Sequence, residues 1–393
     1  MKQIPGGVTA PKGFRAWGVH CGVKSKKADK KDLALILSDQ ECAAAAVYTM
    51  NRVKAAPLYV TMEHLEDGTA WGVAANSGNA NACCPMSHEY AEEMARLAAR
   101  ATGRAPADFV VASTGVIGQT LNIAAIRAGM PAAAAGLTAG PEGSDAAARA
   151  IMTTDTVKKE LALACSIGGR TVTLGAIAKG SGMIHPNMGT MLCFVTTDCA
   201  ITREMLSEAL REVVPRTFNR VTVDGDTSTN DMCAVLANGM AGNPLIEWKD
   251  DGYTVFLKAL RQLCQELARA IAGDGEGASR LITCAVREAR SEESAERLAK
   301  AVVGSPLVKA AMFGADANWG RVLCAMGSPR PPSAPSMWTF PSPPPWVLWP
   351  SAGAAWVWTS TRRPPGASSP RTRWSSTSTS TRESTRPPAG AAT

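Results

Sequence analysis

The composition of this 393-residue chain changes sharply near Gly327, and this change limits what the chain can fold into. From there to the end it holds 14 of the 25 prolines and six of the ten tryptophans, with no Lys, Asp, Asn, Gln, Ile or Tyr. A segment so rich in proline, serine and arginine does not build a packed core. The preceding residues must therefore carry the globular fold, and they are numerous enough for two lobes or one large domain.

Most of the net charge of +7 also originates in this tail. From Ala325 to Thr393 seven arginines face one glutamate, so the first 324 residues hold 34 basic and 33 acidic side chains. The body gives no argument for a nucleic-acid partner. With no run of 18 apolar residues and no apolar signal core in Met1–Gly7, neither a membrane span nor secretion is expected. Eleven cysteines without a CxxC pair and four dispersed histidines predict free thiols in a reducing cytoplasm and no metal site.

Short β-rich apolar runs alternate with helical patterns through the first 324 residues, which predicts a mixed α/β fold. Ser291, followed by two glutamates, is typical of a helix N-cap. Residues 132–150, rich in Ala and Gly, are predicted to form a loop and then a helix. The clearest expected strands are Arg170–Ala178 and Met191–Thr197, and the clearest expected helices are Glu89–Ala101, Arg203–Val214 and Val255–Ile271.

The segment Lys179–Thr197, KGSGMIHPNMGTMLCFVTT, carries the most specific chemistry. A glycine-rich turn leads to Gly189 and Thr190, and an apolar strand follows. The Thr190 hydroxyl can attack the preceding carbonyl, and hydrolysis of the resulting ester frees an amine that can serve as the base for its own hydroxyl. Spacing alone does not establish this, since a glycine turn before a core strand is common.

Several motifs, in a fixed order between residue 5 and about residue 326, resemble those of the ornithine acetyltransferase family. In that family a small residue precedes the nucleophilic threonine, as Gly189 precedes Thr190. The resemblance implies a two-lobed α/β layered sandwich, distinct from a doubly wound nucleotide-binding fold. The segments that carry it are GVTAPKGF (residues 7–14), NSGNANA (76–82), STGVIG (113–118), KGSGMIHPNMGTML (179–192), GDTSTND (225–231) and GADANWGR (314–321).

The resemblance further implies that the chain cuts itself between Gly189 and Thr190. Residues 1–189 would become an alpha chain and residues 190–326 the family-like part of a beta chain, followed by the atypical tail, 327–393. The pieces would stay associated because they share one core. The family analogy implies a cytoplasmic heterotetramer of two alpha and two beta chains.

The implied reaction moves an acetyl group from N-acetylornithine to glutamate in arginine biosynthesis, by a ping-pong mechanism through acetyl-Thr190. No cofactor is implied, and acetyl-CoA remains open as a further acetyl donor. Two alternatives stay in view. The chain could be an N-terminal-nucleophile amidase or aminopeptidase that passes the acyl group to water, or a non-catalytic remnant.

The resemblance assigns roles to five residues besides the nucleophile. Thr114 and Gly115 are implied to stabilise the oxyanion that forms at each acyl-transfer step. Thr153, Lys179 and Glu276 are implied, together with Thr190, to bind substrate. A lysine suits the substrate carboxylate and a glutamate suits an ammonium group. From the residues alone, residues 113–118 would be interpreted as a plain strand-to-helix turn. Lys179 and Glu276 would be interpreted as solvated surface charges.

The tail departs from the family pattern. Family members end with a segment resembling ATAWGCDLT and a short strand whose asparagine, with a nearby threonine, also binds substrate; neither segment is found here. The composition of the tail is typical of a disordered segment. Back-translation of residues 385–393 with GC-rich codons, shifted by one base, gives a sequence close to the missing segment, so a frame-shifted tail is the second interpretation. Loss of a terminal strand would expose apolar surface and unpaired backbone. We then expect poor folding and weak transfer.

Overall fold

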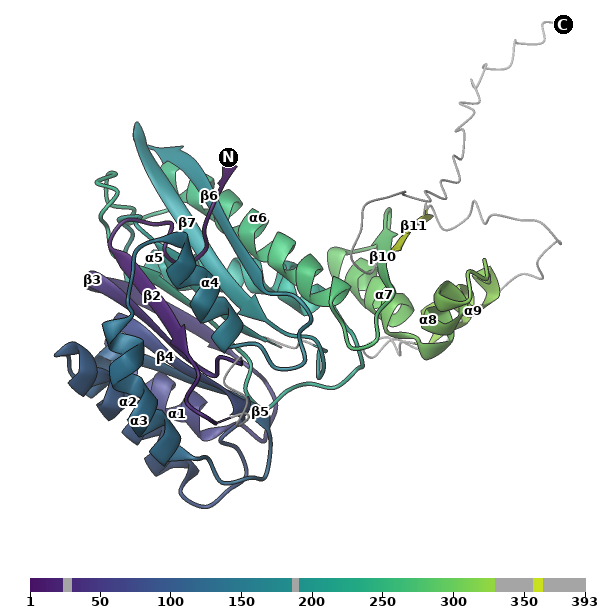
Figure 1. The fold of residues 1–393 in the computed structure, drawn as a ribbon. Helices are drawn as coiled ribbons and strands as arrows, with labels where there is room; N and C mark the ends of the chain where they lie inside the picture. Colours follow the sequence, from purple (N-terminus) through teal and green to yellow (C-terminus); the bar gives the residue numbers. More distant parts are fainter. Residues whose placement is uncertain (24–29, 186–190, 329–355, 363–393) are drawn as a thin grey trace, which may run out of the picture. The chain divides into compact units, whose positions relative to one another are not determined.

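The computed structural model describes residues 1–23, 30–185 and 191–328, together with the backbone of residues 356–362 (Figure 1). The chain divides into two compact units, Met1–Ala278 and Ser279–Thr393. The first unit contains all the described residues of the candidate site. Strands and helices alternate through it, which confirms the predicted α/β class.

Within the described residues, nine strands of the first unit form one mixed sheet in the order β1-β6-β7-β8-β9-β3-β4-β5, with β2 paired to β3. The pairs β4–β5 and β8–β9 are parallel, and the others are antiparallel. The strands are β1 (Lys2–Ile4), β2 (Phe14–Val19), β3 (Leu33–Tyr48), β4 (Thr69–Asn79), β5 (Phe109–Val116), β6 (Lys159–Ile167), β7 (Arg170–Lys179), β8 (Leu192–Thr197) and β9 (Met232–Ala237).

The 16-residue strand β3 divides the sheet into two layers. Its first part pairs with β2 and β4, its last part pairs with β9, and the register shifts between Leu37 and Cys42. The inner faces of both layers meet in one core, which includes Val73 of β4, Val110 of β5 and Phe194 of β8. Since β8 lies between β7 and β9, a cut just before β8 would leave both pieces hydrogen-bonded in one sheet.

Helices cover the two outer faces. One outer core joins α5 and α6 to the β6–β9 half of the sheet, and the other joins α2 and α3 to strands β3–β5 (Figure 1). This arrangement confirms the predicted layered sandwich. The predicted strands and helices are also confirmed, except that residues 132–135 belong to α3. The helices are α1 (Ala56–His64), α2 (Ser87–Thr102), α3 (Ile123–Ala135), α4 (Pro141–Ala150), α5 (Arg203–Val213) and α6 (Asp251–Gly273).

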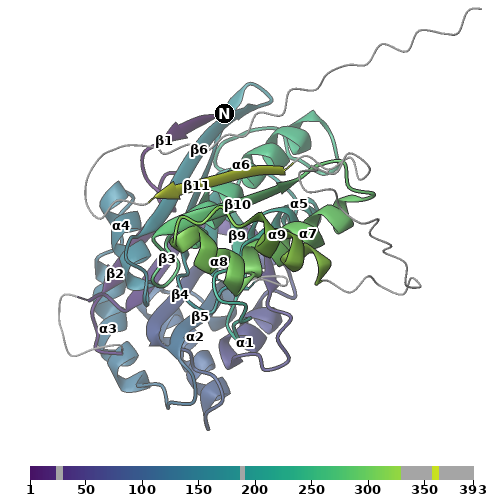
Figure 2. The same ribbon diagram turned by 90° about the vertical axis from the view of Figure 1, so that its right-hand side faces the viewer.

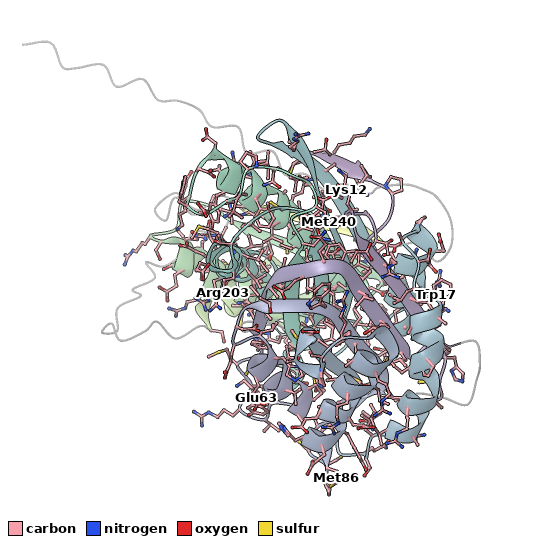
Figure 3. The ribbon with its side chains drawn as sticks, turned by 90° about the vertical axis from the view of Figure 1, so that its left-hand side faces the viewer. Lys12, Trp17, Glu63, Met86, Arg203 and Met240 are labelled. Carbon is pink, nitrogen blue, oxygen red and sulfur yellow. The ribbon has the colours of Figure 1, made fainter. Side chains whose placement is uncertain are left out.

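The N-terminal segment is fixed against the turn that follows β9. Asn238 Nδ2 donates a hydrogen bond of 2.9 Å to the Lys12 carbonyl, and Lys12 and Met240 lie close together in Figure 3. Gly13 has φ +75°, and a Cβ at this position would lie 2.1 Å from the Met240 sulfur. A side chain at residue 13 would therefore push the Met240 side chain out of its position.

The second unit contains β10 (Arg280–Val286), α7 (Glu292–Gly304), α8 (Pro306–Phe313), α9 (Trp319–Gly327) and β11 (Trp356–Arg362), which falls within the tail and pairs antiparallel with β10 (Figure 2). Ser291 Oγ accepts a hydrogen bond from Ser294 N, as the predicted N-cap requires. The buried core among its described residues is small, consisting of Val302, Val308, Val322 and Ala325. Among the helices described in either unit, none has the length and apolarity needed to cross a bilayer.

Candidate active site

A cavity among the described residues lies where β5 and β7 end and where β8 and β9 begin. Lys179, the last residue of β7, pairs with Leu192, the first residue of β8. Leu192 also pairs with Met232, the first residue of β9, and Thr114 lies near the end of β5. The residues that line the cavity are Thr114, Lys179, Gly182, Met183, Ile184, Met191, Leu192, Ser228, Asn230 and Asp231.

The predicted cleavage residues, Gly189 and Thr190, lie outside the described residues. The chain on both sides of them reaches the cavity, since Ile184 and Met191 both line it. Met191 is bonded directly to Thr190. Described residues on both sides of the predicted cleavage site therefore line the same cavity as Thr114 and Lys179.

Lys179 provides a buried positive charge at this cavity. Its exposed fraction is 8%, and among the described residues it forms no salt bridge, in contrast to the nearby Lys159. Burial lowers the pKa of Lys179, while the negative charges of Asp155, Asp231 and Glu276 act in the opposite direction. An amine that is desolvated and not held by a carboxylate is well placed to bind a substrate carboxylate.

Glu276 is exposed and lies over a glycine that lines the cavity. Its backbone N–H donates to the Ser181 carbonyl at 3.1 Å, which fixes residues 275–277 beside the turn after β7. A Cβ on Gly182 would lie 2.4 Å from Glu276 Oε1, so the Glu276 carboxylate lies directly against this glycine. Lys179 thus lines the cavity and Glu276 lies against Gly182 at its edge, although 97 positions separate the two predicted residues in the sequence.

A buried ion network holds together the segments that carry Thr153, Lys179 and Glu276. Lys159 Nζ lies 2.6 Å from Asp155 Oδ1 and 2.8 Å from Asp274 Oδ2, and none of these three side chains is more than 1% exposed. Burial alone would raise the pKa of Asp155, but the charges of Lys179 and Lys159 hold it below its ordinary value. Sequence reasoning missed these three residues, because no local pattern indicates pairing over 115 positions.

The same network fixes the neighbouring backbone. Asp155 Oδ1 accepts a hydrogen bond of 2.8 Å from Gly180 N, and Asp155 Oδ2 accepts one of 2.9 Å from Thr153 N. Ser181 Oγ donates to the Asp274 carbonyl at 2.7 Å. Thr153 is therefore tied to the residue next to Lys179, although it is not among the residues that line the cavity.

Thr114 and Gly115 lie where β4 and β5 run parallel, paired with Ser77 and Gly78. Gly115 has φ +138°, and a Cβ there would lie 2.3 Å from the Gly78 carbonyl carbon, so only glycine fits. Thr114 is buried and lines the cavity, and its hydroxyl forms no hydrogen bond with any described residue. Gly115 is exposed and is not among the lining residues.

Asn230 connects three loops around the site, and sequence reasoning gave it no role. Its Nδ2 donates to the carbonyls of Ala80 at 2.6 Å and Ser113 at 2.9 Å. Ser113 Oγ in turn donates to Asn76 Oδ1 at 2.6 Å. The NSGNANA, STGVIG and GDTSTND segments therefore meet through buried amide hydrogen bonds that fix the position of Thr114.

A layered α/β fold with a buried cation, a free hydroxyl and a carboxylate at one cavity defines an enzyme suited to small charged substrates. The sequence profile of the ArgJ family matches residues 15–339. The chain belongs to the ArgJ family, which confirms the family predicted from its motifs and, with it, acyl transfer in arginine biosynthesis.

The chain is similar to several individual proteins and structures. The chain is 56% identical over 328 residues to the arginine biosynthesis bifunctional protein ArgJ of Symbiobacterium thermophilum, covering 83% of this chain and 81% of that protein. It is 48% identical to the protein of the same name from Geobacillus kaustophilus, covering 82% and 78%. A crystal structure of ArgJ from Bacillus halodurans is 42% identical over 48% of this chain and 97% of that chain, with a TM-score of 0.46.

Proposed function

We propose that this chain cleaves itself before Thr190 and then uses Thr190 to move an acetyl group from N-acetylornithine to glutamate. The observation that carries the proposal is that the residues flanking the segment 186–190 line one cavity with Thr114 and Lys179. Oγ of Thr190 would attack the acetyl carbonyl, form acetyl-Thr190 and release ornithine. The amine of glutamate would then take the acetyl group and restore the hydroxyl.

The charges of the site match those of the donor substrate. N-acetylornithine has a neutral amide at its α-nitrogen, a carboxylate beside it and an ammonium group at the end of its side chain. Lys179 would bind the carboxylate, and Glu276, at the exposed side of Gly182, would bind the ammonium group. Thr153 would bind substrate beside Lys179, because Asp155 accepts hydrogen bonds from both Thr153 N and Gly180 N and so holds the two segments together.

Thr114 and Gly115 would stabilise the oxyanion. Thr114→Val keeps the shape of the side chain and removes the hydroxyl, which has no other partner among the described residues. We expect kcat for acetyl transfer to fall about 100- to 1,000-fold, equivalent to about 3–4 kcal/mol, with little change in KM. Steady-state kinetics check this, with Thr120→Val, at an exposed position, as the matched control. An unchanged kcat would contradict this role.

Glu276→Gln removes the negative charge and keeps the size of the side chain. We expect KM for N-acetylornithine to rise about 10- to 100-fold, since a hydrogen bond between charged groups contributes roughly 1.5–3 kcal/mol. Glu266→Gln, at an exposed position of α6, is the matched control and should leave KM unchanged. Equal KM values for the Glu276→Gln enzyme and the unmodified chain would exclude this contact.

The reaction itself is tested with N-acetylornithine and glutamate. Transfer through acetyl-Thr190 predicts parallel lines in double-reciprocal plots and N-acetylglutamate as the product. Release of free acetate without dependence on glutamate would instead identify an amidase. Acetyl-CoA, offered in place of N-acetylornithine, tests the second donor. An uncut chain without turnover would identify a non-catalytic remnant.

The proposal extends to assembly and location. The two pieces would remain one unit, because β8 of the second piece lies between β7 of the first piece and β9. Two such units would form a heterotetramer of two alpha and two beta chains in the cytoplasm. The enzyme would need no cofactor, since the hydroxyl and the amine of Thr190 supply the nucleophile and the base.

A further inference from the structure

The glycine-rich turn after β7 supplies three residues to the wall of the cavity, namely Gly182, Met183 and Ile184. This turn belongs to the first of the two proposed pieces, whereas residues 222–231 belong to the second. Hydrogen bonds between the two segments would therefore join the pieces to each other after the cut. The contacts that fix this turn determine the shape of one wall of the cavity.

The side chain of Asp224 holds the backbone of this turn. Met183 N donates to Asp224 Oδ2 at 2.6 Å, and Ile184 N donates to Asp224 Oδ1 at 3.0 Å. Asp226 N also donates to Asp224 Oδ1, at 3.0 Å, which orients the carboxylate from its own loop. Hydrogen bonds to a charged acceptor are stronger than neutral ones, so one carboxylate fixes two successive amides of the turn.

Met183 has a backbone conformation that a methionine does not favour. Its φ is +56°, in the left-handed region that residues other than glycine rarely adopt. The Met183 side chain is 41% exposed, so packing in the core does not hold the residue there. Such a conformation persists where surrounding contacts impose it, and the Asp224 carboxylate supplies this contact at Met183 N.

The left-handed residue directly follows the glycine that meets Glu276. A Cβ on Gly182 would lie 2.4 Å from Glu276 Oε1, so the Gly182 backbone touches this carboxylate. Relaxation of φ at Met183 would move the Gly182 backbone relative to the rest of the turn. The conformation of Met183 therefore affects the position of the Glu276 carboxylate.

Other hydrogen bonds hold the next two residues of the turn. Val223 N donates to the Ile184 carbonyl at 2.7 Å, and Thr227 Oγ1 donates to the His185 carbonyl at 2.8 Å. Neither bond involves the Asp224 side chain. Loss of the Asp224 carboxylate would thus free the part of the turn beside Glu276 and leave residues 184–185 attached.

We propose that Asp224 is a positioning residue for the donor substrate, an inference that rests on the proposed function. By holding Met183 in its left-handed conformation, Asp224 keeps Gly182 against Glu276. The Glu276 carboxylate then stays where it binds the ammonium group of N-acetylornithine. Glutamate, the acceptor, has no ammonium group at the end of its side chain. Asp224 should therefore affect binding of the donor and not of the acceptor.

Steady-state kinetics of Asp224→Asn test this role. Asparagine keeps the size of the side chain but cannot accept from both amides, because its Nδ2 is itself a donor. We expect KM for N-acetylornithine to rise about 3- to 10-fold, the effect of roughly one lost hydrogen bond, with little change in kcat or in KM for glutamate. Rates are expressed per amount of cut enzyme, measured on a gel. An unchanged KM for N-acetylornithine would overturn the proposal.

Two further single variants separate the carboxylate from the loop around it. Asp224→Glu keeps the negative charge and both acceptor oxygens, and it should recover part of the affinity for N-acetylornithine that Asp224→Asn loses. Asp226→Asn changes an exposed acid of the same loop and should leave both KM values unchanged. A rise in KM with Asp226→Asn as large as that with Asp224→Asn would show a general effect of the loop and overturn the proposal.

A double variant shows whether Asp224 acts through Glu276. In Glu276→Gln the contact with the ammonium group is already weakened, so adding Asp224→Asn should raise KM for N-acetylornithine less than about 2-fold. A residue that only stabilises the fold would act equally in both backgrounds. Effects of the two substitutions that multiply would therefore overturn the proposal.

Hydrogen exchange tests the contact itself without turnover. The amides of Met183 and Ile184 should exchange about 10-fold faster in Asp224→Asn than in the unmodified chain, because they lose their acceptor, and normally in Asp226→Asn. Equal exchange in Asp224→Asn and the unmodified chain would overturn the proposal. Failure of Asp224 alone would leave the proposed function intact, whereas an unmodified chain that transfers no acetyl group would remove both.

Discussion

Thr190→Ala is expected to leave the chain in one piece and to abolish acetyl transfer. The same hydroxyl would attack the Gly189 carbonyl in self-cleavage and the acetyl carbonyl in transfer, so alanine removes both reactions. Loss of the nucleophile should lower kcat by at least about 10⁴-fold, to the level that binding and oxyanion stabilisation provide alone. A gel of the purified variant and an assay for N-acetylglutamate measure the two effects.

Two variants show whether this result is specific. Thr190→Ser keeps a hydroxyl and should still cleave and transfer, at lower rates. Thr171→Ala changes an exposed threonine at the start of β7 and should behave as the unmodified chain does. If Thr190→Ala were cut and active, the nucleophile would lie elsewhere in the chain.

Lys159→Met is expected to have the largest effect on stability. The Lys159 ammonium pairs with both Asp155 and Asp274, and all three side chains are buried. Methionine fills a similar volume but leaves two carboxylates buried without their cation. Removing one partner of a buried ion pair typically costs about 3–5 kcal/mol, a large part of the stability of a typical domain. Urea unfolding followed by circular dichroism should show this loss in the free energy of unfolding.

The neighbouring residue provides the control. Lys158 also forms salt bridges, with Asp145 and Glu160, but its side chain is 31% exposed. Pairs that are partly exposed to solvent contribute roughly 0–1 kcal/mol, so Lys158→Met should lower stability only slightly. Equal losses in the free energy of unfolding for the two variants would show that burial does not determine how much the Lys159 network contributes to stability.

The secondary structure and the family could be predicted from the sequence, because both depend on local patterns. Helical spacing predicted α5 and α6, and β-rich apolar runs predicted β7 and β8. The predicted loop at the start of residues 132–150 was wrong for residues 132–135, which belong to α3. Pro131 lies inside α3, where Ile126, Met130 and Ala133 are buried against strands β3–β5. Burial of one helix face outweighed the unfavourable local preference.

The arrangement of the site could be predicted only in part. The motifs identified Thr114, Lys179 and Glu276; the first two line one cavity, and Glu276 lies against Gly182, which also lines it. They did not identify Lys159, because its role depends on burial and on partners far away in the sequence. A lysine at the start of a strand is ordinary in sequence, and only the fold shows that two buried acids surround it.

The state of the purified chain tests the central claim most directly. Intact mass measurement and N-terminal sequencing of the freshly purified full-length protein will show whether the peptide bond before Thr190 has been cut. We predict two co-purifying pieces, of which the second begins Thr-Met-Leu-Cys at Thr190. A single uncut chain of 41.1 kDa that transfers acetyl groups to glutamate would contradict the account.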